Sequence, residues 1–292
     1  MRITENRMID LAGQAVNQGR ARVARTGEQL SSGERISRPS EDPAAWAQAR
    51  RAEAARTIGA GRTEAIARSQ EGLALADGAL ASMTESLSRA RELATTTANE
   101  STTPDALQTI LIEMRGLRAS ALAAANTRSV DGEYIFSGSL TSTPAFAADG
   151  TFQGDATTRS VETQAGLAQT VTISGASLTT AAGPGAVDVF GQLGALEDAL
   201  VSGDRDAIAA TLDGLRAAGQ QVSAARAQGG AHSAELVVAD DAQRTLDESL
   251  VALQDRLVGT DPIAAATELA QHSTALSAAQ TVAQRIIELT RP

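Results

Sequence analysis

The longest proline-free stretch that carries a continuous apolar seam constrains the fold most. Residues 44–99 contain no proline, and small or apolar side chains recur there in steps of three and four. The members of this seam are Ile66, Leu73, Ala76, Leu80, Met83, Leu87, Ala90 and Ala94. Such spacing places all of them on one face of an α-helix. The stretch therefore predicts one helix roughly 80 Å long, more than twice the width of a small domain.

Prolines mark the limits of the other helices that the sequence predicts. All seven prolines lie between proposed helices or at Pro292, and none lies inside one. Thr103-Pro104 predicts a helix start, since threonine caps the first turn and proline needs no donor there. The seam that follows contains Leu107, Ile110, Met114, Leu117, Ala121 and Ala124. Because the link at 100–103 is short, we expect this helix to return antiparallel to the first.

The apolar pattern changes to a period of two after Asp131-Gly132. Short runs at 134–136 and 171–173 alternate with glycine, serine and threonine, which predicts short strands and polar turns. Five of the six aromatic residues lie between 134 and 190, so we expect them to form the core of this insertion. Helical spacing resumes at Val189 and, after 202–204, continues to Gly229-Gly230. A last stretch repeats leucine at 246, 250, 253 and 257.

Residues 29–43, here called the joint, end one predicted helix and begin the next. Ser31, Ser32 and Gly33 follow the last seam residue of the first helix, where they can satisfy or release its last carbonyls. Pro39 disfavours helical geometry at the residue before it. Asp42 then reads as an N-cap, with Pro43 at the first helical position. The joint therefore predicts a break between two helices.

The two ends of the chain are predicted to pair. The first helix has a weak heptad seam, because Gly13, Gly19 and Gly27 each cost about 1 kcal/mol relative to alanine. Residues 1–35 carry six arginines and four acids, a net +2, whereas 236–292 carry four arginines and eight acids, a net −4. We expect the first segment to be poorly ordered alone and to become helical only against partners. An acidic partner for the run at 20–25 remains one of two interpretations; simple solvation is the other.

Composition and motifs argue against an enzyme and against several ligands. The net charge is −10, no residue is lysine and no basic cluster stands out, so nucleic acid is not an expected partner. The chain has no cysteine, and its two histidines, His232 and His272, lack the spacing of a zinc site. Acidic pairs such as Asp240-Asp241 fit exposed helix faces better than general acid–base pairs. We predict no catalytic residue, no cofactor and no metal.

Hydropathy predicts neither membrane insertion nor a cleaved signal peptide. No apolar run approaches the roughly 18 residues that a membrane span needs. Residues 1–30 carry charges throughout. Trp46 is far from the other aromatic residues, and two interpretations are open for it: an exposed interface anchor or a plug inside the helix bundle.

The joint residues resemble the N-terminal signature of the flagellin superfamily. The matching residues are Leu30, Ser31, Ser32, Gly33, Pro39, Asp42 and Pro43, and the Pro-x-x-Asp-Pro form is similar to that of hook-associated members. Further stretches match in the same order: 132–138, 143–146, 152–155, 189–190 and 261–286. Family members commonly end in a short hydrophobic tail where this sequence reads Arg291-Pro292.

This resemblance implies a secreted structural subunit of the bacterial flagellum that joins hook to filament. It implies export through the flagellar type III system with unfolded ends, an export chaperone, and folding on assembly. The implied partners are further copies in a ring, a neighbouring hook-associated protein and flagellin. The implied location is outside the cell, at the hook–filament junction.

The predicted fold class is mainly α, an elongated antiparallel helical bundle or coiled coil with paired terminal helices and a small inserted β-rich domain. We predict an inner layer from 1–32 and 258–292, a long-helix bundle from 33–130 and 189–257, and an outer domain at 131–188. The expected subunit interface comprises Ile9, Val16, Val23, Leu30, Trp46, Leu269, Leu276 and Ile286. Two alternatives stay open: a short flagellin that forms the filament itself, and a soluble coiled-coil adaptor.

Overall fold

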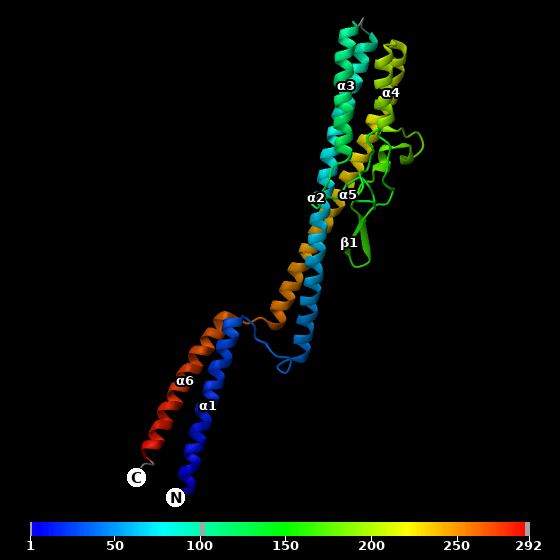
Figure 1. The fold of residues 1–292 in the computed structure, drawn as a ribbon. Helices are drawn as coiled ribbons and strands as arrows, with labels where there is room; N and C mark the ends of the chain where they lie inside the picture. The colour runs from blue at the N-terminus through cyan, green and yellow to red at the C-terminus, as the bar shows by residue number, and fades with distance from the viewer. Residues whose placement is uncertain (1, 100–102, 290–292) are drawn as a thin grey trace. The chain divides into compact units, whose positions relative to one another are not determined.

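The computed structural model describes residues 2–99 and 103–289, so Met1 and residues 100–102 and 290–292, which include most of the predicted link at 100–103, lie outside the described residues. The elements in chain order are α1 (Arg2–Ser32), α2 (Pro43–Asn99), α3 (Pro104–Ala125), β1 (Ser160–Gln164), β2 (Leu167–Thr170), the short 3-10 helices η1 (Gly175–Leu178) and η2 (Thr180–Ala182), α4 (Val189–Ser202), α5 (Arg205–Val258) and α6 (Pro262–Leu289). Figure 1 shows this order. The predicted mainly α fold with a small β insert is confirmed.

Contacts divide the chain into two compact units. The terminal unit contains residues 2–59 and 245–289, and the middle unit contains residues 60–244. The two long helices, α2 and α5, each contribute to both units. The domain bounds predicted from the sequence follow helix ends instead, and they stay a prediction.

Three helices begin at a proline, as the sequence predicts. Pro43, Pro104 and Pro262 are the first residues of α2, α3 and α6. The carboxylate of Asp42 accepts hydrogen bonds from the backbone N–H groups of Ala44 and Ala45, at 3.1 and 3.0 Å. Each helix start thus places an acceptor side chain over donors that have no partner inside the helix.

The middle unit is built around one large core. Every seam residue predicted between Ile66 and Ala94 is buried, and these side chains pack with α3, α4 and α5. Ion pairs tie the helices at their exposed flanks: Asp77 of α2 with Arg226 of α5 at 2.6 Å, and Arg89 of α2 with Glu113 of α3 at 2.6 Å. The hydrogen bond from Arg226 lowers the pKa of Asp77.

The insertion contains one hairpin rather than several strands. β1 and β2 pair antiparallel, with Ser160 opposite Thr170 and a bulge between Glu162 and Gln164. The strands predicted at 134–136 and 171–173 are wrong, because these segments lie outside the named strands. Aromatic packing and side-chain hydrogen bonds hold this loop-rich region instead. Phe146 lies 5.2 Å from Phe152 and 4.8 Å from Phe190 between ring centroids, which confirms the predicted aromatic core.

α5 contradicts one further expectation. It runs without interruption through Gly229-Gly230, where the sequence analysis ended a helical seam. A side chain at Gly229 would place its Cβ 2.6 Å from Cδ1 of Ile173, so this glycine makes room for the insertion instead of breaking the helix. The leucine repeat from 246 to 257 lies on the same helix, where Leu246 is 46% exposed and Leu253 is exposed as well.

Candidate functional site: the terminal helix pair and the joint

The terminal helices pair through the seams that the sequence predicts. α1 and α6 pack along their length and lie side by side in Figure 1. On α1 the less exposed positions are Ala12, Val16, Gly19, Val23, Thr26, Gly27 and Gln29; on α6 they include Ala265, Leu269, His272, Leu276, Ala279, Ala283 and Ile286. The spacing of three and four on both helices is that of a coiled coil.

One contact shows why a glycine lies in this seam. A Cβ atom on Gly19 would lie 3.0 Å from Cδ1 of Leu276 and 3.6 Å from its Cα. The two backbones therefore approach closely where the leucine packs over the glycine. Gly13 and Gly27 have no such neighbour within 4 Å among the described residues.

The predicted interface residues differ in how far this pairing covers them. Val16, Val23, Leu269, Leu276 and Ile286 are half-buried in the seam. Ile9 and Leu30 are exposed. Since the seam residues are only half-buried, the α1–α6 pair leaves apolar area open.

Large apolar side chains also point away from the seam. On α1 these are Met8 and Leu11; on α6 they are Ile263, Val282 and Ile287, of which Ile263 is 79% exposed. Among residues 7–32 and 262–288, Thr26 and Ala265 are the only buried ones. A pair of helices with so little enclosed surface presents its apolar side chains to whatever packs on it.

The joint holds the start of α2 to the end of α5. The backbone N–H of Arg35 donates to the carbonyl of Val258 at 2.6 Å, and the N–H of Thr260 donates to the carbonyl of Gly33 at 2.9 Å. The Arg35 guanidinium donates to the carbonyl of Leu257 at 3.1 Å. Gly33 has φ +73°, a conformation that glycine adopts without strain. Together these three hydrogen bonds, here called the latch, join the joint to the end of α5 and the residues that follow it.

A small apolar cluster lies beneath the latch. Ile36, Ala49 and Val258 are buried, and Trp46 packs on them with Leu257. The guanidinium of Arg50 lies 5.3 Å from the ring of Trp46. Trp46 is thus partly covered within its own unit, and its role at a subunit interface stays a prediction.

The signature residues perform separate local tasks. The Ser31 hydroxyl donates to the carbonyl of Glu28 at 3.0 Å, and the Ser32 hydroxyl accepts from the N–H of Glu34 at 3.1 Å. Pro39 lies in a turn closed by a bond from the N–H of Glu41 to the carbonyl of Arg38. The pattern found these residues but missed the latch partners on the far side of the sequence. The Gly-Thr-Asp-Pro break at 259–262 was the available signal for them.

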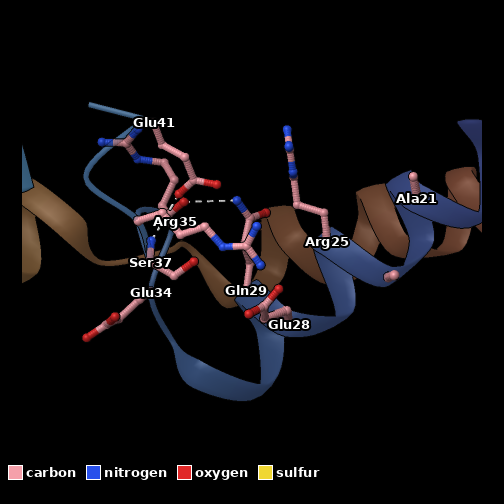
Figure 2. Close-up of a pocket in the computed structure, with 10 residues that line it drawn as sticks. Ala21, Arg25, Glu28, Gln29, Glu34, Arg35, Ser37 and Glu41 are labelled. Atoms are coloured by element: carbon pink, nitrogen blue, oxygen red, sulfur yellow. Dashed lines mark hydrogen bonds between the residues drawn. The ribbon is translucent and has the colours of Figure 1, made fainter. Parts of the chain in front are cut away.

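A polar pocket of about 240 Å³ lies beside the last turns of α1. Its lining comprises Ala21, Ala24, Arg25, Glu28 and Gln29 of α1 and Glu34, Arg35, Ser37, Arg38 and Glu41 of the joint. Figure 2 shows the bond from the Gln29 amide to the Arg35 carbonyl, 3.0 Å, and the bond from the Ser37 N–H to the Glu41 carboxylate, 3.0 Å. Arg25 extends from the ribbon apart from both.

The histidine and acidic side chains among the described residues do not form a recognisable reaction site. Across the described residues, no group of three or more His, Cys, Asp or Glu side chains is placed to hold a metal ion. His232 and His272 are half-buried on α5 and α6. A search of the described helices found none with the length and apolarity of a membrane span.

Comparisons with known proteins give one consistent family. Residues 3–141 match the model of the bacterial flagellin N-terminal helical region. The chain is 29% identical over 147 residues to flagellar hook-associated protein 3 of Escherichia coli K12, which covers 50% of this chain and 46% of that protein. It is 27% identical over 174 residues to the protein of the same name from Salmonella typhimurium LT2, covering 59% and 54%. The chain thus spans about half the length of these relatives.

Solved structures support the fold. A Vibrio parahaemolyticus protein described as a flagellar hook-associated protein superimposes with a TM-score of 0.68 at 21% identity. The match covers 75% of this chain and 100% of that chain. At this identity the similarity shows the fold alone.

Proposed function

We propose that this chain is a structural subunit of the bacterial flagellum that joins hook to filament. The family model and the two relatives confirm the resemblance to flagellins that the joint residues predicted. The relatives named flagellar hook-associated protein 3 favour the junction role over the two alternatives. The observation that carries the proposal is the α1–α6 pair, whose apolar surface is too open for a unit that works alone.

Self-assembly is the function that this surface supports best. Met8 and Leu11 on one helix and Val282 and Ile287 on the other are exposed. Burial of apolar area releases roughly 25 cal/mol per Å², so neighbours that cover these side chains stabilise both helices. We infer that copies pack in a ring, with a neighbouring hook-associated protein on one side and flagellin on the other.

Export with unfolded ends is consistent with the same helices. Gly13 and Gly27 weaken α1 without a compensating contact among the described residues. A helix of this kind is marginal alone and gains order through tertiary packing. We infer passage through the flagellar type III apparatus, with a chaperone holding the apolar seam until assembly outside the cell.

A catalytic role has no support from the relatives, which are flagellar structural proteins. The short-flagellin alternative predicts micron-length filaments from the purified chain. The soluble-adaptor alternative predicts a dilute monomer or dimer that is helical at both ends. Limited proteolysis that trims both ends and leaves a resistant middle would speak against the adaptor.

Deletion of the gene tests the proposal. We expect cells that keep their hooks, lack filaments and shed flagellin into the medium, and we expect the wild-type gene to restore filaments. Normal filaments in the deletion strain would refute the assignment.

Two variants refine this test. Leu276→Asp places a charge in the α1–α6 seam, whereas Ser277→Asp places it on the adjacent exposed position. We expect only Leu276→Asp to fail in restoring filaments, because only that charge is desolvated by pairing.

A further inference from the structure

We propose that the pocket beside α1 binds a stripe of α5, formed by Glu248, Val251 and Asp255, from a second copy of this chain. The proposal rests on the proposed function, which supplies the neighbouring copies. It adds the contact by which one copy recognises the next.

Small side chains and arginines line the pocket. Ala21 and Ala24 come from α1, and Arg25 and Arg38 line the pocket from α1 and the joint. Within the described part of the chain, the guanidinium groups of Arg25 and Arg38 form no hydrogen bond or ion pair. Arg35, by contrast, is held by the carbonyl of Leu257. Two guanidinium groups are therefore available to an incoming carboxylate.

The pocket lining carries carboxylates as well as guanidinium groups, so it offers fixed positive and negative positions and not an excess of one sign. Glu41 is committed to the N–H of Ser37. Glu28 and Glu34 complete the lining. A diffuse anion gains little from such a mixed lining, whereas a partner with carboxylates at fixed spacing can reach the arginines and avoid the acids.

The α5 stripe has the complementary pattern. Glu248, Val251 and Asp255 follow i, i+3, i+7 spacing, so they share one face of the helix. Val251 is 41% exposed, and both acids are exposed too. Seven residues of helix separate the acids by roughly 10 Å. The stripe is an apolar side chain with a carboxylate on either side.

These acids differ from their neighbours on α5 in having no partner among the described residues. Asp247 pairs with Arg56 at 2.8 Å, and Asp240 pairs with Arg244 at 2.6 Å. Glu248 and Asp255 form no ion pair or side-chain hydrogen bond in that part of the chain. An exposed valine between two such carboxylates marks a surface that its own chain leaves uncovered.

The geometry assigns a second copy as the occupant. Val251 would pack on Ala21 and Ala24, and the carboxylates would meet Arg25 and Arg38. Pocket and stripe are different surfaces, so the contact can repeat head to tail, with each copy using both at once. Such contacts build rings or helical stacks, as a junction layer requires.

Cross-linking tests the contact directly, because the chain has no cysteine of its own. Arg25→Cys and Asp255→Cys are made as two separate full-length variants, mixed, assembled on isolated hooks and oxidised. We expect a disulfide-linked dimer from the mixture and none from either variant alone. Asn17→Cys, on an exposed position of the same helix, replaces Arg25→Cys in the control mixture. No dimer, or an equal yield from the control, would overturn the proposal.

Charge exchange gives a second, independent measurement. Arg25→Glu with Arg38→Glu in one variant, and Glu248→Arg with Asp255→Arg in another, should each weaken assembly on hooks by at least about tenfold. An equimolar mixture should recover it, since every pocket then meets a stripe of opposite sign. Circular dichroism of each variant, unchanged from wild type, excludes misfolding. Variants that assemble normally, or a mixture that does not recover, would contradict the contact.

Different results would refute the junction function and the pocket–stripe contact. If the wild-type gene restores filaments to the deletion strain and the charge variants restore them equally well, the contact is wrong and the junction function stands. If the deletion strain has normal filaments, the junction function is wrong.

Discussion

The middle and terminal units use the same helical periodicity but bury very different side chains. In the middle unit the fully enclosed residues include three phenylalanines, two methionines and several leucines. In the terminal unit the buried residues are Thr26, Ile36, Ala49, Ala52, Val258 and Ala265, counted over its described residues. Heptad spacing in the two units is similar, so spacing alone does not make a stable core.

The difference lies in how many elements share each seam. The α2 seam of the middle unit meets α3, α4, α5 and the insertion, which together enclose it. The α1 seam packs on α6. A seam covered on one side is half-buried, and the remaining side needs a neighbouring molecule. We therefore predict that the middle unit folds by itself and that the terminal helices gain order when neighbouring copies cover them.

The largest expected effect is in the middle unit. Phe146→Ala removes a fully buried ring that contacts Phe152 and Phe190. We expect a loss of about 3–5 kcal/mol in the free energy of unfolding. Leu276→Ala, in the terminal seam, should change the unfolding of the dilute chain by less than about 1 kcal/mol. Denaturant titration of both variants measures these free energies of unfolding. Equal losses in the two variants would contradict the proposed difference between the units.

A smaller effect sharpens the comparison at α1. Gly13→Ala and Gly27→Ala add a Cβ into open space, and each should favour helix by about 1 kcal/mol. Circular dichroism of the dilute chain should show more helix for the double variant than for wild type. Gly19→Ala is the matched control, because its Cβ would crowd Leu276 at 3.0 Å. No gain in helix from the double variant would mean that α1 is already ordered.

The smallest expected effect is on pH dependence in the insertion. Hydrogen bonds from the hydroxyl and N–H of Ser139 and the N–H of Thr157 lower the pKa of Asp155 to about 2. A lowered folded-state pKa stabilises the fold above the ordinary pKa near 3.8, and this contribution is lost as pH falls toward 2. Asp155→Asn should therefore flatten the decline in melting temperature between pH 4 and pH 2. An unchanged decline in melting temperature would mean that Asp155 does not contribute to the pH dependence of stability.

Much of this architecture could be read from residue spacing, because helix seams and proline starts are local signals. The α2 seam and the starts at Pro43, Pro104 and Pro262 all appear where the sequence predicts them. The insertion was harder, since its order comes from contacts between distant residues. Asn126, for example, bonds both backbone groups of Phe146 across 20 residues, at 2.9 and 3.0 Å.

The sequence predicted the signature residues and the terminal seams of the candidate site, but not the partners of the joint. Signature residues and the terminal seams were found from their spacing, whereas the latch from Arg35 to Val258 joins residues more than two hundred positions apart. The leucines at 246, 250, 253 and 257 recur with helical spacing, yet Leu246 and Leu253 are exposed on α5. Periodicity shows which face is apolar, and packing decides whether that face is covered.

Hydrogen exchange on the dilute, unassembled chain tests the central claim most directly. The account predicts that backbone amides near Val16 and Leu276 exchange almost as fast as those of an unfolded chain, while amides near Met83 and Met114 are strongly protected. After assembly on hooks, the first set should become protected too. Strong protection near Val16 and Leu276 in the isolated chain would contradict the claim that the terminal helices depend on neighbours.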